Sequence, residues 1–413
     1  MEINVIAKTV EINDTSNCDT FGESAYILGG RAGGTCYAKE GYFESGIHNS
    51  DRAKRIAERT SKSGHHSVFE HSYMTMTITG IPKILAMLLN STEVYTTSEK
   101  SARYTQMEPE LKIEKDLYDK WYKLIKESIE RIYPNMDIDS SKLAYENARY
   151  MTSVFTPTSM IYTVNYRQAS YLVYWLQDLV NRINSYIIGN DSGYVPDFYD
   201  RIAEYAIELK TKLTSIIGEE WVLEPIKKKN FDFFAALNNK DFNKMKAGTF
   251  GNMYSAKYYT SFACLAQLQR HRTIHYEMFL DKHYDLYVPA IVEESALRDE
   301  WIKDLEALCG AGVYPQAMTV GVVESGTIDN FEMKMQERLC ARAQLEIMDC
   351  TRETVLSILD EIGNLDDYSR DKIMKWIDTS ETHFQRKVKM RCQLNRCLEP
   401  CVWGAKHGKT RLI

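Results

Sequence analysis

Residues 74–90 read MTMTITGIPKILAMLLN, a strand pattern that is followed directly by a helix pattern. The first six residues alternate methionine or isoleucine with threonine, which is typical of a strand with one buried face. Gly80 marks the predicted end of that strand, and Pro82 stands where the first turn of a helix tolerates a missing N–H group. Since residues 83–90 are almost wholly apolar, the segment predicts a strand that leads into a buried helix.

Around this segment, the first half of the chain divides into a mixed part and a helical part. The opening residues, MEINVIAKTVEIN, alternate like a strand, so residues 1–110 are predicted to mix strands and helices. From about 111 to 220, apolar residues recur three and four apart with charges between them, which predicts helices. Residues 137–141 look like the capped start of a helix that carries Glu146 and Arg149.

A second unit begins after Trp221 and the basic run at 227–229. It again offers a short apolar segment that ends in charge, then a proline-containing loop at 313–317 and a long helix over about 329–360. The order of elements echoes the first half, although the identity between the halves is low. We therefore predict an N-terminal domain at 1–220, a C-terminal domain at 221–385, and a basic tail with cysteines at 386–413.

Composition excludes several classes of protein. The formal net charge is −6, so the surface as a whole does not favour nucleic acid, and an anion site must be a local group of cations. The sequence contains no run of about 18 apolar residues, so it predicts no membrane span. Nine cysteines scattered over 413 residues are typical of reduced cytosolic thiols rather than of a disulfide framework. The composition predicts a cytoplasmic globular protein.

The first segments with chemical potential are residues 64–71, GHHSVFEH, and residues 98–104, SEKSARY. The second of them offers hydroxyls, a carboxylate and a guanidinium near a helix boundary. An arginine can fork onto a phosphate, so this segment could cradle a nucleotide. Taken alone, a polar helix cap with a surface Arg–Glu pair explains it more often.

Residues 267–272, QLQRHR, place two permanent charges and one titratable charge at the end of an apolar helix. Such a cluster repels itself unless an anion neutralises it, and a diphosphate would serve. A solvated basic helix end is an equal alternative. A third segment carries Arg338 and Arg342, which lie four residues apart and would share one face of a helix. Taken alone, this pattern is most often an exposed stripe on the helix surface.

Taken together, these segments resemble the motifs of flavin-dependent thymidylate synthases. The hallmark of that family is R-H-R, a short spacer and E-x-S-x-R-Y. An H-x-S/T-x-F-E-H segment precedes the hallmark, and A-R, T-x-N-x-R and R-x4-A-Q-x-E-I segments follow it. The matching residues of the first half are His65, Ser67, Glu70, His71, Glu99, Ser101, Arg103, Tyr104, Ala148, Arg149, Thr163, Asn165 and Arg167.

The two halves depart from the family pattern in complementary ways. Where the first half should carry R-H-R it reads Ser91-Thr92-Glu93, and it lacks an arginine near Leu176. The second half supplies Arg270-His271-Arg272, then Arg338, and then the A-Q-x-E-I run at 343–347, but it lacks E-x-S-x-R-Y. Complementary loss favours an active site that both halves compose.

The resemblance implies an α+β fold of two such units in tandem, each a central mixed or antiparallel sheet with flanking helices, plus a long-helix region. It implies reductive methylation of dUMP at C5 to dTMP, with bound FAD, and with NADPH and methylenetetrahydrofolate as co-substrates. No cysteine nucleophile is needed for this chemistry. The subunit would form a homodimer that imitates the family's homotetramer, with no nucleic-acid or membrane partner.

The resemblance also implies residue roles. Three residues would bind the FAD phosphates and border the flavin: Arg270, His271 and Arg272. Five others would form the rest of the FAD pocket: His65, Ser67, Glu99, Asn165 and Arg167. The residues that would bind the nucleotide are Gln267, Arg270, Glu99, Ser101, Arg103, Arg149 and Arg338. The catalytic residues would be Arg338, His271 and Ser101, with Arg338 favouring the charge that develops on the uracil ring.

Rival interpretations remain open at this point. The chain could be a degenerate relative that binds FAD or nucleotide without turnover, or a methylase of UMP or another pyrimidine nucleotide. In the tail, Cys392, Cys397, Cys401 and His407 could form a zinc site, but their spacing fits no standard knuckle. A reduced tail without a metal is therefore the prediction.

Overall fold

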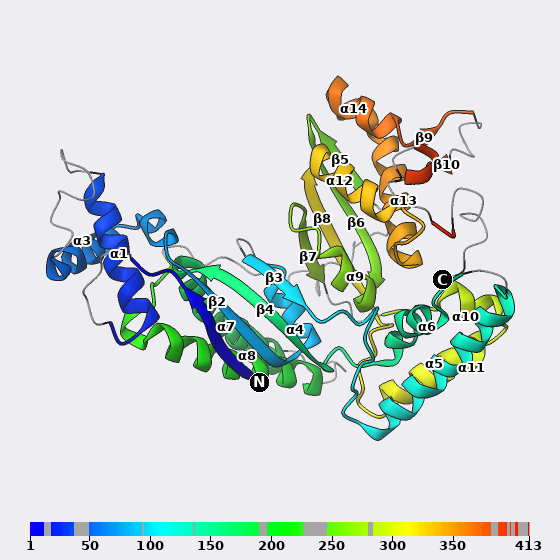
Figure 1. The fold of residues 1–413 in the computed structure, drawn as a ribbon, viewed down its shortest axis with the longest axis horizontal. Coiled ribbons are helices and arrows are strands. Elements are labelled where there is room, and N and C mark those ends of the chain that lie inside the picture. The colour runs from blue at the N-terminus through cyan, green and yellow to red at the C-terminus, as the bar shows by residue number, and fades with distance from the viewer. Residues whose placement is uncertain are drawn as a thin grey trace. The chain divides into compact units, whose positions relative to one another are not determined.

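The protein, seen here as a computed structural model, is described over residues 1–11, 18–36, 49–92, 95–134, 137–189, 196–225, 246–279, 284–380, 387–394, 397, 401–403 and 412. The chain forms two compact units, each built from two stretches of sequence (Figure 1). The first unit contains Met1–Lys100 and Pro157–Phe231, and the second contains Ser101–Thr156 and Asp232–Ile413. This division differs from the expected boundary near residue 220, because residues 101–156 leave the first sheet between two of its strands and pack within the second unit.

An antiparallel sheet of four strands forms the centre of the first unit, in the order β1-β2-β4-β3. Its strands are β1 (Glu2–Lys8), β2 (Tyr73–Pro82), β3 (Tyr95–Glu99) and β4 (Pro157–Asn165). The alternation predicted from residue 74 onward is confirmed, because the methionine and isoleucine side chains of β2 are buried. Gly80 does not end the strand as predicted, since it adopts a φ of 73° at a bulge and β2 continues beyond it.

Helices cover the buried face of this sheet. The predicted helix at 83–90 is confirmed as α4 (Lys83–Leu89), which follows β2 without a break and is buried at every residue. The remaining helical elements are α1 (Phe21–Thr35), α3 (Ser50–Lys62), η1 (His66–Glu70), α7 (Tyr166–Gly189), α8 (Pro196–Ile217) and η3 (Glu219–Trp221). Helix α7 contacts β4, and α8 contacts both α4 and α7 (Figure 1).

The prediction that residues 111–220 are helical is wrong at β4. The run PTSMIYTVN alternates buried and less buried side chains and pairs with β2 on one side and β3 on the other. This short period-two pattern lies between two long stretches with helical periodicity. When the whole of residues 111–220 is taken together, the helical periodicity dominates and hides the strand.

The second unit contains a sheet of the same design, in the order β5-β6-β8-β7. Its strands are β5 (Lys246–Phe250), β6 (Met253–Ser261), β7 (His275–Phe279) and β8 (Thr319–Thr327). In the first sheet Pro82 pairs with Pro157, and Ser261 pairs with Thr319 at the corresponding end of β6 and β8. The α+β prediction with two similar sheets is confirmed, and all the strand pairs in both sheets are antiparallel.

The common register makes positions in the two sheets comparable. Thr92 stands ten residues beyond the end of β2, and His271 stands ten residues beyond the end of β6. Leu176 follows the end of β4 by eleven residues, as Arg338 follows the end of β8. The matching strand order, pairing and spacing indicate an internal repeat in which only the second copy carries this histidine and this arginine.

A helical insertion stands between the third and fourth strands of each repeat, and both insertions belong to the second unit. They contain α5 (Lys112–Ile132), α6 (Ser140–Ala148) and η2 (Arg149–Met151) in one case, and α10 (Ala290–Glu294) and α11 (Arg298–Gly310) in the other. Helices α5 and α11 lie side by side (Figure 1). Trp121 of α5 meets Trp301 of α11 edge to face, with ring centroids 4.7 Å apart, and both are fully buried. This contact explains why residues 101–156 pack within the second unit.

The long helix expected over 329–360 is in fact two helices, α12 (Ile328–Arg338) and α13 (Leu345–Asp360). Arg338 ends the first of them, so Arg338 and Arg342 do not share a helix face as predicted. The chain turns between the two helices because Gln344 and Glu346 form hydrogen bonds with buried residues elsewhere in the unit. The unit ends with η5 (Ile362–Asn364), α14 (Asp367–Met374), β9 (Ile377–Asp378), β10 (Lys387–Val388) and η6 (Arg391–Leu394).

Candidate functional site

Arginines from both repeats meet in the second unit. Arg103 lies in the turns that precede α5, Arg149 begins η2, and Arg338 ends α12. Arg103 Nη2 donates to the carbonyl oxygen of Arg342 at 3.1 Å. Burial lowers the pKa of the Arg338 guanidinium, and the nearby charge of Arg103 acts in the same direction. Arg103 and Arg338, which come from motifs that are distant in the sequence, therefore lie close enough for their charges to interact.

Arg149 is held at the end of a capped helix. The predicted cap is confirmed, because Asp139 accepts from the backbone N–H of Lys142 at 3.0 Å at the start of α6. Arg149 is buried, donates to the side-chain oxygen of Gln344, and lies 3.4 Å from the carbonyl oxygen of Ala263. The guanidinium thus joins the first repeat's insertion to α9 (Phe262–Leu268) and to the start of α13.

Glu346, the glutamate of the A-Q-x-E-I run, is a buried structural centre. Its carboxylate accepts from Tyr150 Oη at 2.6 Å, from Thr260 Oγ1 at 2.9 Å, and from the backbone N–H and hydroxyl of Ser261 at 2.8 and 2.7 Å. Gln344 donates in turn to the Tyr150 hydroxyl. Because a buried carboxylate must be supplied with donors, these bonds fix α13 against β6 and the inserted segment.

His271 is a neutral acceptor rather than the titratable cation that the sequence predicted. Arg338 Nε donates to His271 Nε2 at 2.7 Å, which places the imidazole proton on Nδ1. Burial, together with the charges of Arg338 and Lys334, lowers the pKa of His271 to about 3. Glu337 lies 3.5 Å from the same ring nitrogen, but it is an exposed carboxylate that water screens. His271 therefore orients Arg338 without adding charge.

Several buried polar atoms around these arginines have no hydrogen-bond partner in the described part of the chain. They are the side-chain nitrogen and oxygen of Gln267, Nε of Arg149, Oε1 of Glu146 and the hydroxyl of Tyr276. Gln267 is only 5% exposed, and its backbone oxygen lies 3.4 Å from Arg338 Nη2. Since buried polar groups in proteins are almost always paired, this group fits a polar ligand that brings both donors and acceptors.

The other expected residues of the second unit lie around this group. Arg270 and Arg272 are exposed in the turn between α9 and β7, on either side of the buried His271. Ser101 is half-buried, and its hydroxyl lies 3.4 Å from the backbone N–H of Arg103. The arrangement supplies permanent positive charge on the surface next to a neutral, buried hydrogen-bonding site.

The remaining expected residues lie in the first unit. His65 directly precedes η1 and Ser67 lies in it, and both are exposed. Asn165 is buried, where it accepts from the backbone N–H of Gln168 at 2.7 Å. Arg167 forms an ion pair with Glu70. Glu99 forms an ion pair with Lys83 at 2.5 Å, and both side chains are almost fully buried.

The structure places three further charged residues in these networks, of which only Glu146 was named from the sequence, as part of the capped helix. Lys83, the partner of Glu99, is the single charge in an otherwise apolar helix, which is the signal that could have revealed it. Glu146 forms a largely buried ion pair with Arg103, whereas the alternative explanation of residues 98–104 was a surface pair within that segment. Lys334 is fully buried, and nothing in its local pattern predicted this.

Lys334 belongs to a buried network directly behind Arg338. Its ammonium lies 2.5 Å from Glu324, and neither side chain is exposed to solvent. Tyr258 and Tyr254 donate their hydroxyls to the same carboxylate at 2.5 and 3.2 Å. Because Lys334 stands one helical turn before Arg338, the pair fixes α12 on β8 and determines where Arg338 projects.

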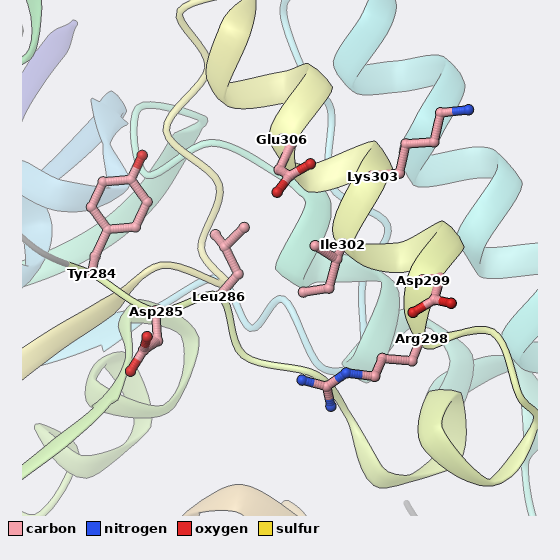
Figure 2. Close-up of a pocket in the computed structure, with 8 residues that line it drawn as sticks. All are labelled: Tyr284, Asp285, Leu286, Arg298, Asp299, Ile302, Lys303 and Glu306. Carbon is pink, nitrogen blue, oxygen red and sulfur yellow. The ribbon is translucent and has the colours of Figure 1, made fainter.

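A surface hollow of about 560 Å³ lies elsewhere in the second unit (Figure 2). Its lining comes from the segment before α10 and from α11: Tyr284, Asp285, Leu286, Arg298, Asp299, Ile302, Lys303 and Glu306. None of the expected site residues belongs to it. Its charges are of both signs, and Arg298 is already paired with Glu293.

Cysteines 392, 397 and 401 of the tail are free thiols, and His407 lies outside the described residues. Within the described ranges, no three histidine, cysteine, aspartate or glutamate side chains are grouped so that they could hold a metal ion. No helix in the same ranges is long and apolar enough to cross a membrane.

Comparison with known proteins connects this chain to one family. Residues 29–174 match the family model described as thymidylate synthase complementing protein. The flavin-dependent thymidylate synthase of Thermococcus onnurineus (strain NA1) is 25% identical over 121 residues, which cover 27% of this chain and 48% of that relative. The chain therefore spans about half the length of the curated relative it matches.

Two solved structures are also similar. The UMP/dUMP methylase PolB from Streptomyces cacaoi, bound with 5-Br dUMP, aligns with a TM-score of 0.31 and 16% identity over 53% of this chain and 93% of that chain. The flavin-dependent thymidylate synthase ThyX from Helicobacter pylori, complexed with FAD and dUMP, aligns with a TM-score of 0.31 and 17% identity over 54% and 98%. TM-scores this low carry no argument, so the assignment depends on the sequence match.

Proposed function

We infer that this chain, which matches the family of thymidylate synthase complementing proteins over residues 29–174, methylates a uracil nucleotide at C5. The proposed substrate is dUMP, the proposed cofactor is FAD, and NADPH and methylenetetrahydrofolate are the proposed co-substrates. Among the residues of this chain, those of the second unit give the strongest support for a nucleotide site.

The observation that carries the proposal is the unpaired side-chain amide of Gln267. A carboxamide presents one donor and one acceptor, which complement the carbonyl oxygen and N3–H of a uracil edge. Leaving such a buried group unpaired costs about 1–3 kcal/mol, and a bound base would remove this cost. The neighbouring arginines would favour an anionic nucleotide over a free base.

Arg338 is the proposed catalytic cation. Its Nε is committed to His271, so the guanidinium is held in one orientation. A fixed cation beside the uracil edge favours the negative charge that develops on the ring when C5 becomes nucleophilic. His271 contributes by remaining neutral, because a protonated imidazole could not accept this hydrogen bond.

Arg270 and Arg272 are the proposed holders of the FAD phosphates. Both are exposed permanent cations, and the histidine between them adds no charge of its own. A bound flavin would supply the hydride and carry the one-carbon unit. We propose that His65, Ser67, Glu99, Asn165 and Arg167 also take part in binding FAD, and that the chain acts as a homodimer.

A relative that binds nucleotide without turnover is the second candidate function. The observation that favours it is the loss of the histidine and arginine equivalents in the first repeat, where Thr92 and Leu176 stand. Tritium release from C5-labelled dUMP, in the presence of FAD, NADPH and methylenetetrahydrofolate, separates the two candidates. Release above the no-enzyme rate supports methylation, whereas tight dUMP binding without release supports the second candidate.

The base-binding role is tested with Gln267→Leu, which has a similar size but no amide. We expect dUMP affinity to fall by roughly ten- to a hundredfold while FAD binding is retained, because one donor and one acceptor to the base are lost. Gln177→Leu, on α7 of the first unit, is the control and should leave the affinity unchanged. Equal dUMP affinity in the Gln267 variant and the wild type would contradict the proposal.

A further inference from the structure

Glu146 is buried inside the arginine group, but only one of its two oxygens has a partner. The side chain is 2% exposed, and Oε2 forms an ion pair with Arg103 Nε. Oε1 is also buried and has no hydrogen-bond partner among the described residues. A carboxylate oxygen in this situation is costly, since each charged group removed from water needs donors in return. The missing donor is therefore expected to arrive with a ligand.

The charges around Glu146 decide what kind of ligand can approach. Arg103 is bound through Nε to Glu146 and through Nη2 to the backbone oxygen of Arg342. Arg149 stands three residues after Glu146, on the same side of the helix end, and one of its Nη atoms is bound to Gln344. Glu146 offsets the charge of Arg103, and the atom that this pair leaves without a partner, Glu146 Oε1, is an acceptor that needs a donor.

These contacts change the role expected for Arg103. A phosphate dianion carries no donor at neutral pH and would meet the negative oxygen of Glu146. The donors of a uracil nucleotide are N3–H and the hydroxyls of the sugar. Since the amide of Gln267 complements the base edge, the sugar hydroxyls remain as the group that suits Glu146.

We propose that Glu146 Oε1 accepts a hydrogen bond from a sugar hydroxyl of the nucleotide and thereby determines which sugars the site takes. This assignment rests on the proposed function and extends it from the base to the sugar. Arg103 is then a positioning residue that holds the carboxylate in place.

The test compares three nucleotides on the FAD-loaded protein: dUMP, UMP and 2′,3′-dideoxy-UMP. All three share the base and the phosphate, so their relative affinities report only on the hydroxyls. A hydrogen bond to a charged acceptor changes affinity by about ten- to a hundredfold. The wild type should therefore bind dUMP at least about tenfold more tightly than the dideoxy nucleotide if the 3′-hydroxyl is the donor. If the 2′-hydroxyl is the donor, UMP should exceed dUMP by a similar factor.

Two substitutions at Glu146 then show whether this carboxylate is responsible. Glu146→Gln keeps the shape and a neutral acceptor, so the preference should shrink, because charge-assisted hydrogen bonds are roughly twice as strong as neutral ones. Glu146→Leu removes the acceptor, so the preference should vanish. FAD binding and the melting temperature of each variant show that the protein is folded. Glu293→Gln, which alters the exposed pair with Arg298, is the matched control and should keep the wild-type preference.

The outcomes separate this inference from the function on which it rests. A wild type that binds all three nucleotides equally overturns the assignment of Glu146 and leaves the base site standing. A preference that persists undiminished in Glu146→Leu also overturns it, as does an equal loss of affinity for all three nucleotides in that variant. If no uracil nucleotide binds to the wild type, the proposed function fails and the sugar assignment fails with it.

Discussion

Replacing Lys334 by methionine is the most direct test of how the second unit positions Arg338. The ammonium of Lys334 lies 2.5 Å from Glu324, both side chains are fully buried, and the aromatic rings of Tyr258, Tyr276 and Phe331 surround it at 5.7–6.0 Å. Methionine matches the length of the lysine stem and can keep the same packing. The change therefore removes the charge and little else.

The expected cost follows from the carboxylate that is left behind. Breaking a buried ion pair by removing one partner typically costs about 3–5 kcal/mol, because the remaining charge is uncompensated. Glu324 keeps its hydrogen bonds from Tyr254 and Tyr258, so the lower end of the range, about 3 kcal/mol, is expected. The double variant Lys334→Met, Glu324→Gln leaves no buried charge and should recover most of this loss.

The first repeat shows that the fold accepts these positions without charge. Tyr162 precedes the end of β4 by three residues, as Glu324 precedes the end of β8, and Leu172 follows β4 by seven residues, as Lys334 follows β8. Both residues of the first repeat are buried. The assay is urea unfolding of wild type, single and double variants, followed by circular dichroism. A single variant within about 1 kcal/mol of the wild type, or a double variant no more stable than the single one, would refute this reasoning.

Four further predictions concern individual contacts. Because the native pKa of His271 is about 3 and the ordinary value is 6.5, the unfolded chain binds this proton more readily; stability should fall as pH drops from about 6.5 towards 3. His271→Gln should flatten that dependence in unfolding curves measured across this range. Tyr150→Phe removes a buried donor to Glu346 and should cost about 1–3 kcal/mol by urea unfolding, and a smaller loss would contradict the role of Glu346. Arg338→Lys keeps the charge but loses the bond to His271, so tritium release should fall by roughly ten- to a hundredfold with FAD still bound. Metal analysis of the purified protein should find no stoichiometric zinc, and one zinc per chain would overturn the expectation of a metal-free tail.

The candidate site was predictable from sequence where the information lay in residue type and short spacing. The arginine-histidine-arginine segment, the A-Q-x-E-I run and the S-x-R-Y segment were identified from short motifs, and the structure brings Arg103 and Arg338 close together. The charge state of each group could be predicted less well from the sequence. The sequence predicted a titratable charge at His271, and burial makes that residue neutral.

The sequence by itself determined the local elements of this protein. The strand and buried helix of residues 74–90 follow from side-chain periodicity, and the cap at Asp139 follows from one residue's ability to accept a backbone hydrogen bond. These features depend on neighbours within a few residues, so no distant contact is needed to predict them.

Only the tertiary structure decided which segments belong together and which charges pair. It assigned residues 101–156 to the second unit through Trp121 and Trp301, and it paired Arg103 with Glu146 rather than with Glu99. These choices depend on burial by partners that are far away in sequence. Periodicity cannot report them, because it describes the side of an element that is buried and not the residue that buries it.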